Sequence, residues 1–153
     1  MVTLITGIGV DTVDIARFAT KISEHPRVRE RLFTLGEQQL PVPSLAARFA
    51  AKEALVKALG GSTRGATHLK WHDIEVLRTG EQPRFSHTEG LAAMLAACGV
   101  SRLHLSLTHD GGFATAFVVA ECEAAADPAS SASPELPAQL PGEPLDEEGT
   151  GTR

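Results

Sequence analysis

The stretch from Ser44 to Gly61, S-L-A-A-R-F-A-A-K-E-A-L-V-K-A-L-G-G, decides the fold of this chain. Ser44 is a residue type that caps helix N-termini, and the Gly60-Gly61 pair is a typical helix stop. At about 100° per residue, large apolar side chains lie on one side of this helix and alanines on the other. A helix that is apolar nearly all round belongs inside a protein. The stretch therefore predicts a long, buried, central helix.

This predicted helix also carries four charged residues: Arg48, Lys52, Glu53 and Lys57. Burying charge is costly unless the charge is paired or contacts a ligand. A structural explanation exists, because Glu53 and Lys57 have the i,i+4 spacing of a helix salt bridge and long basic side chains can cover apolar neighbours. The alternative is that the helix presents these charges to a bound ligand. The helix by itself leaves both explanations open.

A second informative segment is residues 4–11, L-I-T-G-I-G-V-D, which alternate as a strand. Two glycines and Asp11 share one face, and glycines on one face let a ligand or another backbone approach closely. The pattern is not a dinucleotide fingerprint, because Thr12 stands at the position of the third glycine. Asp11 itself suits a turn or cap as well as a ligand. We expect a basic helix to run from Thr12 towards Arg31.

The remaining sequence alternates between strand and helix patterns. We expect strands at 71–78 and 84–86, a helix at 88–98 stopped by Gly99, and a hairpin of strands 101–108 and 113–121 around Asp110-Gly111-Gly112. Leucines at alternate positions of the 101–108 strand would face the core. Helices mixed with antiparallel strands in this way predict an α+β fold.

Size and composition restrict the class of protein. The chain has 153 residues and 42% hydrophobic residues, enough for one modest core. No apolar run is long enough for a membrane span, and no charged-then-apolar signal segment begins the chain. Cys98 and Cys122 lack zinc or redox spacing, which is typical of a reduced protein. We therefore expect a cytoplasmic protein without a membrane partner.

Charge is unevenly distributed along the chain. Residues 124–153 hold six acidic residues and one base, with no apolar period, so we predict a folded domain at 1–123 and a disordered, acidic, proline-rich tail at 124–153. Residues 1–70 hold ten basic and six acidic residues, although the net charge of the whole chain is −5. This basic half is either a solvated surface or a site for an anionic partner. Nucleic acid is a poor candidate, because the protein is acidic overall and lacks a binding motif.

Three blocks taken together carry a family resemblance. They are G-I-G-V-D-x-V-D-I-x-R-F at 7–18, R-F-A-A-K-E-A-L-V-K-A-L-G at 48–60, and L-H-L-S-L-T-H at 103–109. In order and separation they resemble the holo-[acyl-carrier-protein] synthases, the short-chain 4'-phosphopantetheinyl transferases, over about residues 1–123. The resemblance implies that family's fold, an antiparallel sheet packed against a long central helix. It also implies a homotrimer with active sites between subunits, in which the alanine-lined helix would permit close subunit contact.

The resemblance further implies an activity. Members of the family transfer the 4'-phosphopantetheine arm of coenzyme A to a serine of an acidic apo acyl carrier protein and release adenosine 3',5'-bisphosphate. The resemblance also implies that the modified carrier serves fatty acid biosynthesis. The reacting pyrophosphate is highly anionic, so positioning and charge neutralisation should supply most of the catalysis. Mg²⁺ held by a few carboxylates suits this chemistry, with Mn²⁺ as a substitute.

The site residues implied by the resemblance fall into four groups. The metal ligands are Asp11 and Glu53. The catalytic residues are Glu53 and Lys57, and either Glu53 or a metal-bound water accepts the serine proton. The coenzyme A contacts are Arg48, Lys57, Gly60, Ser106 and His109. The carrier protein docks on Arg17 and Lys21, beyond the pyrophosphate site.

Two features depart from the family pattern, and two other function classes stay open. Gly60 is followed by Gly61-Ser62-Thr63 where many members have T-G, and segment 34–43 is shorter than the usual helix and contains two prolines. The alternatives are a coenzyme A or nucleotide binding module without chemistry, and a structural trimer whose buried charges fix its assembly. Asp11 and Glu53 together favour the enzyme, because binding alone does not require a metal pair.

Overall fold

The computed structural model describes residues 2–61, 69–80 and 82–124. In chain order the elements are β1 (Val2–Asp14), α1 (Ile15–Glu24), α2 (Pro26–Leu32), the 3-10 turn η1 (Glu37–Gln39), α3 (Val42–Ala58), the 3-10 turn η4 (Trp71–Asp73), β2 (Val76–Thr79), β3 (Gln82–Phe85), α4 (Glu89–Cys98), β4 (Arg102–Asp110) and β5 (Phe113–Ala124). None of the helices in these ranges has the length and apolar character needed to cross a membrane.

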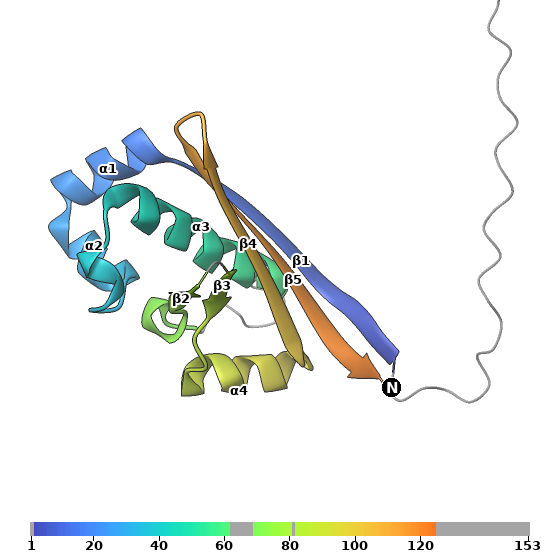
Figure 1. Cartoon of the computed structure of the whole chain (residues 1–153). Coiled ribbons are helices and arrows are strands. Elements are labelled where there is room, and N and C mark those ends of the chain that lie inside the picture. The colour runs from blue at the N-terminus through green and yellow to red at the C-terminus, as the bar shows by residue number, and fades with distance from the viewer. Residues whose placement is uncertain (1, 62–68, 81, 125–153) are drawn as a thin grey trace, which may run out of the picture.

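The strands form two antiparallel sheets. β1, β5 and β4 pair in that spatial order, while β2 and β3 form a separate two-stranded sheet. Figure 1 shows α3 lying against one face of the three-stranded sheet, with α4 near the start of β4. The predicted α+β fold with an antiparallel sheet is confirmed.

The contact between β1 and α3 is a backbone-to-backbone contact. A Cβ atom at Gly7 would lie 1.8 Å from the carbonyl oxygen of Ala58, and one at Gly9 would lie 1.8 Å from that of Ala54. The glycine face of β1 therefore admits another backbone. The alanine side of α3 is buried within the chain, so the expectation that it contacts a neighbouring subunit is wrong.

Helix α3 begins two residues before the predicted cap. Pro41 occupies the N-cap position and Pro43 lies in the first turn, where the missing N–H of proline costs no hydrogen bond. Ser44 is therefore inside the helix. The helix ends as predicted, because Gly60 and Gly61 adopt positive φ angles of 89° and 55° directly after it.

The N-terminal strand is longer than predicted, and the basic helix after it is divided. Thr12 pairs with Thr115, so β1 continues to Asp14, whose Oδ1 accepts a hydrogen bond from the Arg17 amide at 2.9 Å and caps α1. The predicted helix start at Thr12 is wrong. Pro26 ends the continuous helix and begins α2, since proline cannot continue the hydrogen-bond ladder.

The predicted strand 71–78 is wrong in its first half. Residues Trp71–Asp73 form a 3-10 turn, because the Asp73 carboxylate accepts a hydrogen bond from the Lys70 amide at 3.1 Å. The second predicted strand, 84–86, instead spans Gln82–Phe85.

The helix at 88–98 and the final hairpin are confirmed. Thr88 caps α4, and Gly99 ends it in the left-handed conformation. Gly111 and Gly112 have the positive φ angles that a two-residue hairpin requires. The predicted tail lies outside the described residues except for Ala124, the last residue of β5.

Lys52 is fully buried and ion-paired. This pairing explains how α3 accommodates one of its four charges inside the protein. Its Nζ donates to Glu37 Oε2 at 2.7 Å, to the Leu32 carbonyl at 2.8 Å and to the Trp71 carbonyl at 3.1 Å. A buried ammonium with three acceptors is a structural element that ties α3 to three neighbouring segments. The side chain therefore does not extend to the surface.

We predict that Gly9→Ala destabilises the protein by about 3 kcal/mol or more, because a methyl group cannot occupy the space of the Ala54 carbonyl. Thermal and denaturant unfolding measure this loss. Gly36→Ala is the matched control, since its new Cβ would lie 3.7 Å from the nearest heavy atom and φ is −68°. It should change stability by less than about 1 kcal/mol. Equal stability of the two variants would contradict the packing of β1 on α3.

Candidate active site

A cleft of about 550 Å³ brings the two predicted metal ligands together. Asp11 reaches it from β1 and Glu53 from α3, and Arg17 and Lys21 of α1 also line it. We call this space the carboxylate cleft. Arg17 was expected beyond the pyrophosphate site, but it borders the same cleft as both carboxylates.

Lys57 connects β1 and α3, the two elements that carry Asp11 and Glu53. Its Nζ donates to Asp11 Oδ1 at 2.8 Å and to the Val10 carbonyl at 2.9 Å. The structural explanation from the sequence paired Lys57 with Glu53, one turn earlier on the same helix. Among the ion pairs of the described residues, Lys57 instead pairs with Asp11 across the strand–helix contact. The basic group therefore lies beside the predicted metal ligands.

The ionisation of Glu53 reflects its surroundings. Burial raises the pKa of the Glu53 carboxyl above its ordinary value, and the negative charge of Asp11 raises it further, while Lys57 and Lys21 act in the opposite direction. A carboxylate with raised proton affinity is a better proton acceptor near neutral pH. Glu53 is thus suited to proton transfer as well as to metal binding.

The oxygen donors of the carboxylate cleft fit a hard divalent ion that takes its remaining ligands from water and a substrate. In residues 2–61, 69–80 and 82–124 no group of three or more His, Cys, Asp or Glu side chains is placed to hold a metal. Mg²⁺ commonly uses one or two carboxylates and completes its coordination with water and substrate phosphates. Asp11 and Glu53 supply oxygen donors of this kind, and a cation between them would offset the charge of Asp11, which adds to the effect of burial in raising the pKa of Glu53.

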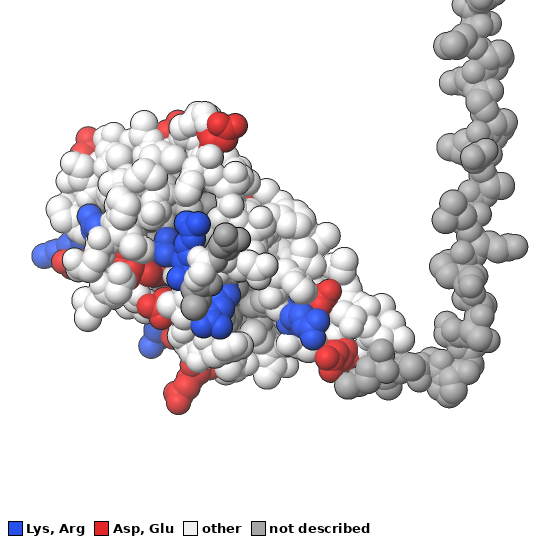
Figure 2. Space-filling model, viewed as in Figure 1, with Lys and Arg blue, Asp and Glu red and all other residues white. Residues whose placement is uncertain are grey.

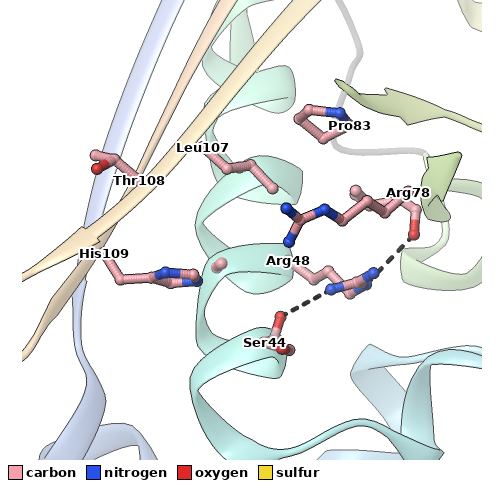
Figure 3. Close-up of a pocket in the computed structure, with 9 residues that line it drawn as sticks. Ser44, Arg48, Arg78, Pro83, Leu107, Thr108 and His109 are labelled. Atoms are coloured by element: carbon pink, nitrogen blue, oxygen red, sulfur yellow. Dashed lines mark hydrogen bonds between the residues drawn. The ribbon is translucent and has the colours of Figure 1, made fainter. Parts of the chain in front are cut away.

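A second pocket, of about 330 Å³, gathers positive charge. Arg48 of α3 and Arg78 of β2 extend into it, and His109 points towards it from β4 (Figure 3). The Arg48 guanidinium is oriented by the Val76 and Ser44 carbonyls, each 3.3 Å from a donor nitrogen. We call this space the basic pocket. In Figure 2 basic side chains gather near the middle of the visible face, over α3 and the β2–β3 sheet.

The two arginines of the basic pocket favour the binding of an anion. Burial lowers the pKa of Arg48, Glu37 partly offsets this effect, and the like charge of Arg78 adds to it. Neither arginine belongs to an ion pair within the described part of the chain. Two guanidinium groups facing one pocket suit a phosphate, which they can bind through several charge-assisted hydrogen bonds.

Arg78 was missed by the sequence analysis. It lies in none of the three family-like blocks, and no local pattern marks it. Its position depends on β2 packing beside α3, which is a tertiary contact. In the sequence Arg78 is only an arginine on a predicted strand, two residues after Val76, which the structure shows to be buried.

Two other predicted contacts lie elsewhere. Ser106 is exposed and borders a neighbouring hollow with Arg84 and His104, which meets the basic pocket at Pro83. Gly60 follows α3, where its amide donates to the Lys57 carbonyl at 3.0 Å. The structure therefore places His109 and Arg48 together, with Ser106 beside them and not among them.

The carboxylate cleft and the basic pocket lie on different sides of α3. Arg48 and Glu53 are five residues apart, so they project about 140° away from each other around the helix axis. The two sets of lining residues have no member in common. One copy of the chain thus contains both halves of the predicted site without joining them in one pocket.

Comparison with known proteins identifies the class. The chain matches the 4'-phosphopantetheinyl transferase superfamily over residues 7–118. The holo-[acyl-carrier-protein] synthase of Clavibacter sepedonicus is 52% identical over 123 residues, which cover 80% of this chain and 100% of that protein. Holo-[acyl-carrier-protein] synthase from Neisseria meningitidis has a similar crystal structure, with a TM-score of 0.68 and 34% identity over 76% of this chain and 98% of that one.

A further solved structure was determined with a ligand. The Helicobacter pylori holo-[acyl-carrier-protein] synthase in complex with coenzyme A has a TM-score of 0.62 and 28% identity, covering 74% of this chain and 98% of that one. The chain therefore belongs to the 4'-phosphopantetheinyl transferase superfamily, within its holo-[acyl-carrier-protein] synthase family, and is an enzyme of the transferase class.

Proposed function

We propose that this protein transfers the 4'-phosphopantetheine arm of coenzyme A to a serine hydroxyl of an apo acyl carrier protein, with Mg²⁺ as the cofactor. The observation that carries the proposal is that Asp11 and Glu53 face one cleft, with Lys57 paired to Asp11. The names of the relatives, and the coenzyme A complex of the Helicobacter pylori protein, support the same substrates.

The reaction exchanges one phosphorus–oxygen bond for another. The serine oxygen forms a bond to the phosphorus that carries the pantetheine arm, and the bond from that phosphorus to the bridging oxygen of the pyrophosphate breaks. Adenosine 3',5'-bisphosphate leaves with the electron pair. The serine proton passes to the Glu53 carboxylate, which faces the same cleft as Asp11.

Lys57 and the metal ligands would deal with the charge of the pyrophosphate. Lys57 lies beside Asp11 and can donate to the leaving group's oxygens as a point charge. Asp11 and Glu53 would hold Mg²⁺, which when bound would neutralise part of the negative charge that develops during transfer. Mn²⁺ has the same preference for oxygen donors and would serve as a substitute.

The basic pocket is the proposed site for a phosphate of coenzyme A. Arg48, Arg78 and His109 line it, and two guanidinium groups without carboxylate partners in the described residues suit a phosphate dianion. Ser106, in the adjoining hollow, and Gly60, at the end of α3, remain candidates for further contacts with the same substrate.

The carrier protein would dock on α1. Arg17 and Lys21 lie on this helix and border the carboxylate cleft, so an acidic carrier held there would bring its serine close to Asp11 and Glu53. We also propose that the protein acts in the cytoplasm and that its acyl carrier protein serves fatty acid biosynthesis.

A homotrimer would join the two halves of the site. The outer face of the sheet exposes a row of apolar side chains, including Ile8, Val10 and Phe117, which are 56%, 45% and 44% exposed. Val10 pairs with Phe117, so these residues form a continuous patch across β1 and β5. A neighbouring copy covering this patch would bury apolar surface and bring its own pocket residues to the first copy's cleft.

The test of the proposed activity is a change in mass. Incubation of the protein with coenzyme A, Mg²⁺ and an apo carrier should increase the carrier's mass by one phosphopantetheine group. Binding of coenzyme A without a change in the carrier would instead indicate a binding module. If the protein neither binds coenzyme A nor modifies the carrier, the structural trimer remains as the explanation.

We expect Asp11→Ala and Glu53→Ala each to reduce turnover at least about a hundredfold. Each variant removes a proposed ligand of the metal ion that would stabilise the charge of the transition state. Steady-state transfer assays measure the effect, with circular dichroism as the check on folding. Removal of divalent ions with a chelator should abolish the activity of the wild type. Full activity of Glu53→Ala in the presence of chelator would refute the metal assignment.

We expect Arg17→Ala to raise the KM for the carrier about tenfold, to reduce the salt dependence of that KM, and to leave coenzyme A affinity nearly unchanged. Arg27→Ala removes the same charge from an exposed position on α2 and serves as the matched control. A parallel loss of coenzyme A binding in Arg17→Ala would place this residue in coenzyme A recognition instead.

We expect two inactive variants to complement each other if the site is shared between subunits. Asp11→Ala retains a complete basic pocket, and His109→Ala retains a complete carboxylate cleft. Random mixed trimers should recover about a quarter of wild-type activity, since one site in four then combines two intact halves. Mixed trimers that stay inactive would contradict the shared site.

In light scattering, the full chain and a version ending at Ala124 should both be trimeric.

A further inference from the structure

Glu37 is a buried carboxylate to which the proposed reaction assigns no role. It lies in η1, is 3% exposed, and has three donors within hydrogen-bond distance. Its Oε2 accepts from Lys52 Nζ at 2.7 Å and from the Thr34 amide at 3.0 Å, and its Oε1 accepts from the Val76 amide at 3.0 Å. Such a fully satisfied carboxylate holds its neighbours rigidly.

These contacts form a closed ring that includes an arginine of the basic pocket. Val76 donates its amide hydrogen to Glu37 and accepts a hydrogen bond from Arg48 Nε at its carbonyl. Arg48 and Lys52 are four residues apart on α3, so the helix closes the ring from Lys52 through Glu37 and Val76 back to Arg48. The position of the Arg48 guanidinium is thereby coupled to the buried ion pair.

The same ring also acts on the second arginine. Val76 is the first residue of β2, and Arg78 lies two residues further along this four-residue strand. Both Val76 and Arg78 line the basic pocket, as does Arg48. Anchoring the start of so short a strand on Glu37 therefore sets the distance between the two guanidinium groups.

Lys52 has a separate electrostatic effect in this arrangement. Glu37 is close enough to Arg48 to stabilise its charged form. If Glu37 were not held by Lys52, its carboxylate would be free to pair with Arg48 and compete with an anionic ligand. The ammonium of Lys52, with three acceptors and no exposure, keeps this carboxylate occupied.

We propose that Lys52 and Glu37 are positioning residues for the basic pocket, which hold Arg48 and Arg78 at the separation needed to bind a phosphate of the nucleotide substrate. The inference rests on the proposed function, because it takes the basic pocket to be the coenzyme A phosphate site. Neither residue lines the basic pocket. Their effect is transmitted through the backbone of Val76.

Two double variants test this inference without leaving a lone charge in the core. Lys52→Met/Glu37→Gln removes both charges but keeps an amide oxygen that can accept the Val76 hydrogen bond. Lys52→Met/Glu37→Leu removes that acceptor as well. Calorimetric titration with adenosine 3',5'-bisphosphate, the product of the proposed reaction, measures the nucleotide end of the site without requiring turnover.

The Leu-containing variant should bind adenosine 3',5'-bisphosphate about tenfold more weakly than the Gln-containing one, the size expected from losing a hydrogen bond that orients a charged group. Its KM for coenzyme A should rise by a similar factor. Its kcat at saturating coenzyme A and its KM for the carrier should change less than about threefold, a split that general unfolding would not produce.

Two further variants keep the test decisive. Glu75→Gln is the matched control, since Glu75 precedes Val76 and accepts a hydrogen bond from Thr34 Oγ1 at 2.8 Å but lies outside the ring. It should bind the product like the wild type. If the Leu-containing variant does not fold, Glu37→Asp in the wild-type background replaces it, because the shorter side chain cannot reach both Lys52 and Val76, and weaker product binding is again expected.

The outcomes separate the inference from the proposed function. A wild type that does not bind adenosine 3',5'-bisphosphate would refute the proposed function and the inference with it. A wild type that binds, with Gln-containing and Leu-containing variants of equal affinity, would overturn the positioning role alone. The same holds if Glu75→Gln weakens binding as much as the Leu-containing variant does.

Discussion

The approach of two glycines of β1 to the backbone of α3 is the constraint on which the site depends. Gly7 and Gly9 have no room for a Cβ atom, so the strand lies directly on the Ala54 and Ala58 carbonyls. Asp11 shares their face and is carried onto the same helix. The carboxylate and the helix charges therefore meet because small residues remove the side-chain layer that normally separates a strand from a helix.

Around this contact, α3 distributes its four charges to different surroundings. Lys52 is buried and paired with Glu37, whereas Lys57 reaches Asp11 and Glu53 faces the carboxylate cleft. Arg48 points into the basic pocket on another side of the helix. One helix thus combines a buried ion pair at Lys52 with three charged side chains that lie at or beside the two pockets. The Glu53–Lys57 bridge expected from the sequence is replaced by the pair of Lys57 with Asp11.

The separation of the carboxylate cleft from the basic pocket has a physical consequence for assembly. Arg48 and Glu53 project about 140° apart around the axis of α3 and line different pockets. The exposed apolar patch of β1 and β5 offers a surface that a second copy can bury. This separation and this patch are the reasons for proposing that the two halves meet at an interface between subunits.

Much of this organisation follows from the sequence by itself. Local periodicity identifies the buried helix, the glycine face of the first strand and the final hairpin, because the period and the glycine positions are properties of neighbouring residues. The combination of the three blocks also indicates the family and singles out Asp11, Glu53 and His109. These are features for which short-range pattern and residue chemistry are sufficient.

Other features were decided only by the tertiary structure. The extension of β1 to Asp14 depends on pairing with β5, which overrides the helix pattern after Asp11. The partner of Lys57 is Asp11 and not Glu53, because the strand contact brings a better-placed carboxylate. Arg78 and Glu37 enter the site through the packing of β2 and η1 against α3. Such contacts join residues that are distant in sequence, so no periodic pattern along the chain encodes them.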